Sequence, residues 1–247
     1  MLNIFHYFGL VGIVLFYSFY SFLRLRVYWQ DLPYHIVHLG YNAIFIVVLT
    51  ITFTGMVISL ELSKEAVRYG VADMVGGGVA IAMAREFGPM LTAIVLIGRS
   101  GSSIAAQIAT MKITDQIDAL RSMGISVYDY LVSPRLIAMV LTQPLITLFS
   151  MISGTVGGAF MAKIYANISY KLYFDSIGRF LSTGDIIGGL IKSVVFAFVI
   201  VVISVVEALE CPRNSAGVGI AVTSAVMKSI IAVFILNFIL SYFLFAH

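Results

Sequence analysis

Six stretches of about 20 residues carry no ionised side chain or only one, and this pattern restricts the chain to few folds. A helix needs about 20 apolar residues to cross the roughly 30 Å hydrocarbon core of a bilayer. No segment alternates polar and apolar residues over about ten positions, as the wall of a membrane barrel must. The sequence therefore predicts an all-α integral membrane protein. The stretches are Leu2–Leu23, Leu39–Leu60, Pro89–Met111, Leu136–Ala162, Ile186–Val206 and Ser229–Ala246.

Composition excludes several other classes of protein. Hydrophobic residues make up 60% of the chain and charged residues 11%, whereas a soluble domain carries about 25% charged residues. The formal net charge of +3 is too small and too scattered for nucleic-acid binding. The single cysteine, Cys211, and four histidines without ligand spacing argue against a disulfide framework and a metal site.

The first apolar stretch fits two structures. It lacks a basic leading region and has no small-residue cleavage site before Arg24 and Arg26, so we do not expect a cleaved signal peptide. Its length suits a membrane span. Its aromatic residues and the two following arginines equally suit a helix lying in the headgroup boundary.

The second stretch continues as a charged helix as far as Tyr69. From about His38 the helix would be about 45 Å long, so its end must stand in water or in a water-filled cavity. The next segment, Val71–Ala84, contains three consecutive glycines and is expected to be short and flexible. Pro89 suits the first turn of the following helix.

Small residues recur four apart in that helix, which predicts close helix packing. The two rows are Gly98 with Ser102, and Gly101 with Ala105 and Ala109.

The longest polar connection between two spans contains a predicted short helix from Thr114 to Met123. Thr114 can cap its start, Asp115 suits the first turn, and Gly124 can end it in the left-handed conformation. Apolar and polar positions fall on opposite sides, with Ile113, Ile117 and Leu120 on one and Asp115, Asp118 and Arg121 on the other. Such a helix is either a loop lying on the membrane or a lever moved by a cytosolic partner.

Ionisable residues at membrane depth form a second signal, because each costs at least ~2.5–3.5 kcal/mol at the bilayer centre. Arg99 lies ten residues into its helix and should bond to backbone or carboxylate groups inside the bundle. Lys192 lies two turns into its span and could extend its amine to the interface. Glu207 lies at a helix end. Arg85 and Glu86 precede the Gly88-Pro89 start of a helix.

Catalysis by this chain is not expected. Gly98–Gly101 reads GRSG, the tetrapeptide of rhomboid-type serine proteases, but no histidine is placed to act as its base. The chain has no GxxxxGK[ST] motif, so ATP hydrolysis would need another chain. Lysine and arginine are divided six against six between the two sides, which leaves the orientation open.

Two regions resemble the signatures of a known permease family, the MlaE/YrbE family. The first, Glu86–Arg135, reads EFGPMLTAIVLIGRSGSSIAAQIATMKITDQIDALRSMGISVYDYLVSPR. The second reads LIKSVVFAFVIVVISVVEALECPRNSAGVGIAVTSAVMKS. The resemblance implies the membrane subunit of an ABC transporter that moves phospholipid between the inner and outer membranes of a double-membraned bacterium.

The resemblance also implies an architecture and partners. A single permease domain would comprise interfacial and elbow helices over residues 1–38 and five spans over 39–247, in the bacterial inner membrane. Two copies would dimerise on a cytosolic ATPase dimer and below a periplasmic hexamer of MCE domains. A small STAS-like regulatory subunit stays an open question. This chain would hold no cofactor, since ATP and Mg would bind to the ATPase, and it would bind no nucleic acid.

Residues carried over from the family define two expected sites. The lipid cavity would be lined by Ile58, Glu61, Glu65, Tyr69, Arg85, Glu86, Lys192 and Asn237. The helix that couples to the ATPase, between the second and third spans, would use Thr114, Asp115, Ile117, Asp118, Leu120, Arg121, Met123 and Gly124. Asn237 stands where some relatives have an acid, and Ile220 where an arginine is common.

An alternative function is a secondary transporter of an amphiphilic substrate, driven by an ion gradient through Glu86 and Lys192. Such carriers usually contain internal repeats, and the chain has no second copy of the Gly88-Pro89 pattern. A passive scaffold would leave the embedded charges unexplained.

Overall fold

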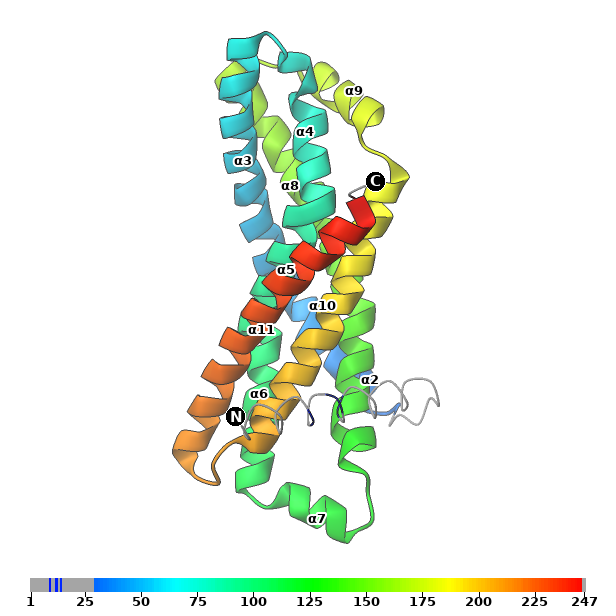
Figure 1. Cartoon of the computed structure of the whole chain (residues 1–247), viewed down its shortest axis with the longest axis vertical. Coiled ribbons are helices and arrows are strands. Elements are labelled where there is room, and N and C mark those ends of the chain that lie inside the picture. The colour runs from blue at the N-terminus through cyan, green and yellow to red at the C-terminus, as the bar shows by residue number, and fades with distance from the viewer. Residues whose placement is uncertain (1–8, 10–11, 13, 15–28, 246–247) are drawn as a thin grey trace. The chain divides into compact units, whose positions relative to one another are not determined.

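The computed structural model describes residues 9, 12, 14 and 29–245. The predicted interfacial helix near the N-terminus falls mainly outside these residues. The described residues form helices and connecting turns, without a strand (Figure 1). Within them, five helical segments are long and apolar enough to cross a membrane, which confirms the predicted all-α membrane fold. They are Leu32–Tyr69, Ala72–Ile113, Tyr128–Ala166, Thr183–Glu210 and Ser215–Phe245.

Several of these segments combine α-helix with short π or 3₁₀ turns. The α-helices are α2 (Leu32–His35), α3 (Ile44–Tyr69), α4 (Val75–Ala82), α5 (Gly88–Leu96), α6 (Ser102–Ile113), α7 (Gln116–Ser122), α8 (Ser133–Ala166), α9 (Tyr170–Phe180), α10 (Thr183–Glu210) and α11 (Ser215–Phe245). The π turns are η1 (Ile36–Gly40), η4 (Met83–Phe87), η5 (Ile97–Gly101) and η6 (Tyr128–Val132), and the 3₁₀ turns are η2 (Tyr41–Ala43) and η3 (Ala72–Met74).

The contacts divide the chain into two compact units. Unit 1 comprises the described residues up to Ala43 together with Leu96–Thr142 and Val195–Phe234. Unit 2 comprises Ile44–Val95, Gln143–Val194 and the residues from Ile235 onward.

Close packing of α3 on α8 organises unit 2. A Cβ added to Gly55 would overlap the carbonyl oxygen of Gly154, so only glycine lets the two backbones approach this closely. The Ser59 hydroxyl donates to the Gly158 carbonyl oxygen at 2.7 Å. In a membrane, where lipid tails do not drive helices together, such backbone approach and interhelical hydrogen bonds hold the pair.

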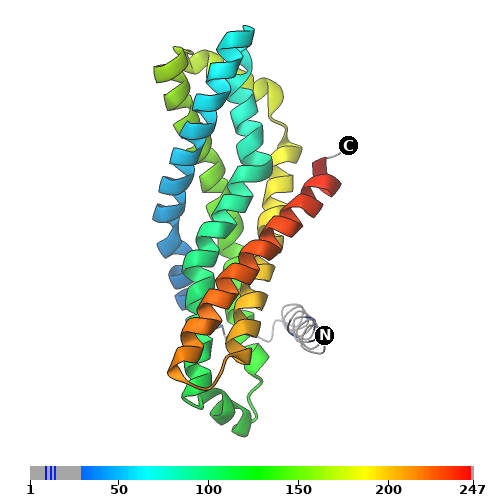
Figure 2. The same cartoon turned by 60° about the vertical axis from the view of Figure 1, so that its left-hand side comes forward.

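The glycine-rich segment Val71–Ala84 is helical rather than flexible, which corrects the sequence prediction. It forms η3 and α4, and α4 packs between α3 and α9 (Figure 2). A Cβ on Gly76 would overlap the carbonyl oxygen of Tyr173, and one on Gly77 would meet the ring of Phe180. These glycines therefore serve close packing against α9, a use that the run of three does not reveal.

Unit 1 contains the expected partner of Arg99. Its guanidinium donates to the His38 carbonyl oxygen at 2.9 Å, which confirms that it bonds to backbone inside the bundle. The row Gly101, Ala105 and Ala109 is buried, which confirms the predicted close packing, and the neighbour of Gly101 is α10. The other row was predicted wrongly, because Gly98 is exposed and has no neighbour within 4 Å of an added Cβ.

Candidate functional site

A cluster of polar side chains in unit 2 forms around the amine of Lys192. This side chain is completely buried, and its three hydrogens have three acceptors: the Arg85 carbonyl oxygen at 2.7 Å, Glu86 Oε1 at 2.9 Å and Ser241 Oγ at 2.7 Å. The amine therefore does not extend to the interface, and that interpretation of the sequence was wrong. A buried cation is tolerated here because it is both paired and fully hydrogen-bonded.

The carboxylate of Glu86 is bound on both oxygens. Oε1 accepts from Lys192 and from the Ser241 hydroxyl at 2.7 Å, and Oε2 accepts from Asn237 Nδ2 at 2.8 Å. Its side chain remains 35% exposed. Asn237 Oδ1 is buried and has no hydrogen-bond partner. The Asn237 amide therefore uses its nitrogen but not its oxygen.

Arg85 does not pair with its neighbour Glu86. Its Nε donates to Asp185 Oδ1 at 2.7 Å, and Asp185 Oδ2 also accepts from the Ser182 backbone N–H at 2.9 Å. The ring of Phe245 lies over both cations, 5.0 Å from Arg85 Cζ and from Lys192 Nζ. The Arg85 side chain is 37% exposed, and its two terminal nitrogens have no hydrogen-bond acceptor among the described residues. They are free to bind an anionic group.

The structure brings together Arg85, Glu86, Lys192 and Asn237, which are four of the eight residues that the family resemblance assigned to one cavity, and it adds three members. We call the full set the polar cluster: Arg85, Glu86, Asp185, Lys192, Asn237, Ser241 and Phe245. Two signals could have found the additions. Ser241 lies one helical turn after Asn237, and Asp185 is an acid in the first turn of a membrane helix, where it needs a partner.

The predicted cavity residues of α3 occupy other positions in unit 2. Ile58 is half-buried, and exposed Glu61 pairs with Lys64 at 2.8 Å. Glu65 and Tyr69 line a shallow groove of about 230 Å³ with residues of η3 and α4. None of the four forms a hydrogen bond or ion pair with the polar cluster among the described residues. Their role in lipid binding stays a prediction.

The predicted short helix exists as α7 in unit 1, with a different start. Asp115 is the N-cap residue and adopts a left-handed backbone at φ 57°, while the Thr114 hydroxyl donates to the Thr110 carbonyl oxygen of the preceding helix at 2.9 Å. Thr114 therefore closes α6 instead of capping α7. The predicted end is confirmed, since Gly124 has φ 74° and the Ile125 N–H donates to the Leu120 carbonyl oxygen at 3.0 Å.

The two faces of α7 have different environments. Ile117 and Leu120 are buried and anchor the helix in unit 1. Arg121 and Met123 are exposed, Met123 by 65%. The amphipathic pattern is thus confirmed, and only the exposed side is available to another protein.

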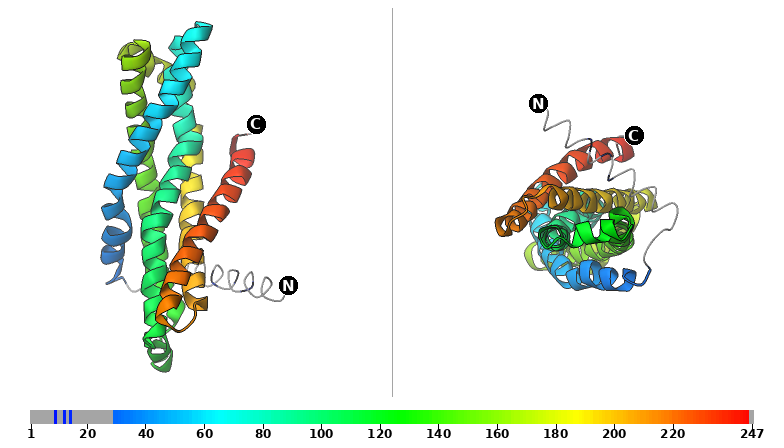
Figure 3. Two further views of the ribbon diagram at one scale, coloured as in Figure 1. Left: turned by 90° about the vertical axis from the view of Figure 1, so that its left-hand side faces the viewer. Right: turned by 90° about the horizontal axis from the view of Figure 1, so that it is seen from below.

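Two cations fix α6 and α7 to the turn between α10 and α11 in unit 1. Lys112 Nζ donates to the carbonyl oxygens of Leu209 and Cys211, each at 2.6 Å, and so closes the C-terminal end of α10. Arg213 bridges two acids of the α7 region, with nitrogens 2.8 Å from Asp118 and 3.6 Å from Asp115. Figure 3 shows α7 crossing from α6 toward the segment that leads into α8.

Five long apolar helices with charged side chains buried among them define a multi-pass membrane protein. The chain belongs to the MlaE permease family, because a family described as Permease MlaE matches residues 32–243. It is 36% identical over 90% of its length to the chloroplastic protein TRIGALACTOSYLDIACYLGLYCEROL 1 of Arabidopsis thaliana, of which it covers 64%.

Bacterial relatives match at similar levels. A probable ABC transporter permease protein of Synechocystis is 36% identical over 83% of this chain and 78% of its own length. A probable ABC transporter permease protein of Rickettsia typhi is 34% identical over 95% of this chain and 92% of its own length.

Proposed function

We propose that this chain is the membrane subunit of an ABC transporter that moves phospholipid between the inner and outer membranes of a bacterium. The observation that carries the proposal is the family match over residues 32–243. Curated relatives named as ABC transporter permeases support it. The chain itself breaks no bond in this account, and nucleotide shifts its population between conformations.

The polar cluster supports a phospholipid as the substrate. A phosphodiester needs hydrogen-bond donors, and the two terminal nitrogens of Arg85, whose side chain is 37% exposed, can supply them. Arg85, Glu86, Asp185 and Lys192 sum to zero formal charge, so the cluster needs no permanent counterion and can accept a zwitterionic headgroup. The Arabidopsis relative bears the name of a lipid, trigalactosyldiacylglycerol.

The α7 region supports an ATPase partner. Its exposed side offers Arg121 and Met123, while its buried side is anchored in unit 1. We propose that α7 seats on one chain of a cytosolic ATPase dimer, which binds ATP and Mg, and that two copies of this permease form the membrane part. A periplasmic MCE hexamer would accept the lipid.

Ion-gradient transport is the alternative, and the buried Glu86–Lys192 pair is the observation that favours it. Protonation of Glu86 would release the Lys192 amine in that mechanism. Lipid movement would then follow a pH gradient and need no ATPase.

Reconstitution with the cognate ATPase separates these functions. Co-expressed wild-type protein should carry phospholipid through purification and transfer it between vesicles with ATP. Arg85→Gln should lower the bound phospholipid several-fold, while the double variant Arg121→Ala, Met123→Ala should keep the bound lipid and lose ATP-driven transfer. Lys171→Ala, an exposed change on α9, is the matched control and should do neither. Transfer that follows a pH gradient without ATPase would contradict the proposal.

A further inference from the structure

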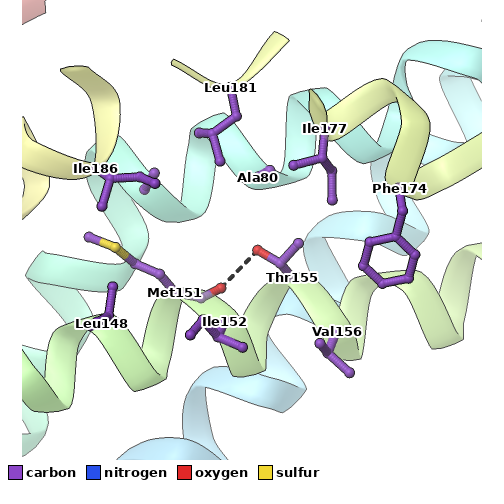
Figure 4. A pocket seen from close by; sticks show the side chains of 11 residues that line it. Ala80, Leu148, Met151, Ile152, Thr155, Val156, Phe174, Ile177, Leu181 and Ile186 are labelled. Carbon is purple, nitrogen blue, oxygen red and sulfur yellow. Dashed lines mark hydrogen bonds between the residues drawn. The ribbon is translucent and has the colours of Figure 1, made fainter. Parts of the chain in front are cut away.

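An apolar groove of about 240 Å³ lies in unit 2, apart from the side chains of the polar cluster. It is bounded by α4, α8, α9 and the start of α10. Its lining consists of Ala80, Ala84, Leu148, Met151, Ile152, Thr155, Val156, Phe174, Ile177, Leu181 and Ile186. Figure 4 shows Ile177 and Leu181 on one side of the groove and Met151 and Thr155 on α8 opposite them.

The lining offers almost no polar group to a ligand. Thr155 carries its one hydroxyl, which already donates to the Met151 carbonyl oxygen at 2.8 Å (Figure 4). A headgroup, a peptide or water would lose hydrogen bonds on entering, whereas hydrocarbon would lose none. The chemistry of the groove therefore selects an alkyl chain.

The groove is continuous with the surface that α8 presents to the bilayer. Leu148, Ile152 and Val156 line the groove and are exposed on a helix long enough to span a membrane. Exposed apolar residues extend this surface along the same helix, at Leu141, Leu145, Phe149 and Phe160. In a membrane the opening of the groove faces lipid tails rather than water.

The helix α9 places one end of the groove near the headgroups. Its residues Phe174 and Ile177 line the groove, while Lys171, Asp175 and Arg179 are exposed on its other side. That division is typical of a helix lying in the membrane interface. From Val156 to Leu148 the groove then follows α8 for about 12 Å, close to the roughly 15 Å of hydrocarbon in one leaflet.

Tyr173 fixes α9 against α8 beside this groove. Its side chain is fully buried, and its hydroxyl donates to the Thr155 carbonyl oxygen at 3.2 Å. Burial raises the pKa of the Tyr173 phenol, so the group stays neutral and keeps this bond. The helix α9, which bounds the groove, is therefore fixed to α8 by a hydrogen bond.

We propose that this groove is a binding site for one acyl chain of a bilayer lipid. The bound chain lies against Ala84 and Ile186, which directly adjoin Arg85 and Asp185 of the polar cluster in sequence. An alkyl chain in the groove therefore supports the two backbone segments that carry this ion pair. The proposal rests on the membrane placement of α4, α8 and α10 and not on ATP-driven transport.

Photolabelling tests the site without ATPase or nucleotide. The full chain is placed in phosphatidylcholine nanodiscs that contain a phosphatidylcholine probe with a diazirine on one acyl chain, and adducts are mapped by mass spectrometry. Adducts should concentrate on groove residues such as Thr155, Ile177 and Leu181, several-fold above the exposed α8 residue Phe160.

Variants that fill the groove decide between a site and bulk lipid. Ile177→Trp should lower groove labelling several-fold. Thr155→Leu adds less bulk and should also lower the labelling, and it serves as the test if the tryptophan variant does not fold. Leu145→Trp adds bulk to the lipid-facing side of α8 outside the groove and should leave the labelling unchanged. Equal labelling of groove residues and Phe160, or labelling unaffected by both filling variants, would overturn the proposal. Because no transport is measured, this result is independent of the proposed function.

Discussion

At the scale of single residues, Lys192 shows how this chain tolerates a charge inside a membrane helix. Its amine donates to a carbonyl, a carboxylate and a hydroxyl, so no hydrogen is left without an acceptor. The Glu86 side chain is partly exposed, so the desolvation penalty of the pair is smaller than that of two fully buried ions. The arrangement fits a site that must stay polar next to hydrocarbon.

Removing one partner of the Lys192–Glu86 pair should therefore lower the free energy of unfolding more than removing both partners. Lys192→Met leaves the Glu86 carboxylate without its cation, and we expect a loss of roughly 2–3 kcal/mol of unfolding free energy, reduced by the partial exposure of Glu86. The double variant Lys192→Met, Glu86→Gln should recover most of this loss. Thermal unfolding of the purified proteins in detergent measures both. Equal stability of wild type and single variant would show that the pair does not hold unit 2 together.

At the scale of elements, backbone contact between α3 and α8 sets the packing of unit 2. Gly55 and Gly154 meet backbone to backbone, and Ser59 adds a hydrogen bond one turn further along α3.

Gly55→Ala should force α3 and α8 apart. An added methyl overlaps the Gly154 carbonyl oxygen, and overpacking of this kind costs about 1–3 kcal/mol. Gly178→Ala, at an α9 position with open space around it, is the matched control and should be neutral or slightly stabilising. Thermal midpoints in one detergent compare the two. A Gly55→Ala protein as stable as the control would refute the close approach.

The sequence predicted the spans and the end of α7 because hydropathy and a left-handed glycine are local properties. Gly124 ends the helix through its own left-handed backbone conformation, which does not depend on a distant residue. Gly76 and Gly77 misled the prediction because their role depends on Tyr173 and Phe180, about 100 residues away. Thr114 misled it because the end of one helix and the start of the next compete for the same hydroxyl.

The polar cluster was predictable in part for a related reason. Charged residues inside apolar stretches stand out, so Arg85, Glu86 and Lys192 were found, but their pairing could not be predicted. The pairing depends on which carboxylate the fold brings near, and Arg85 takes Asp185, 100 residues away, rather than its neighbour.

At the scale of the whole molecule, we propose that one permease chain performs two tasks. In this proposal the polar cluster of unit 2 would bind the lipid, and α7 of unit 1 would receive the movement of an ATPase. Arg213 and Lys112 attach α6 and α7 to the turn between α10 and α11, so displacement of α7 would act on the ends of both membrane helices.

Site-specific crosslinking from α7 tests the central claim most directly. Cys211 is the chain's one cysteine and is buried, so Cys211→Ser gives a background in which Met123→Cys is the sole thiol. Exposed Met74 on η3 provides the matched control, Met74→Cys. In membranes containing the active complex, we predict that a thiol-reactive photocrosslinker at position 123 captures the ATPase chain and that the same reagent at position 74 does not. An active complex in which position 123 never captures the ATPase would contradict the account.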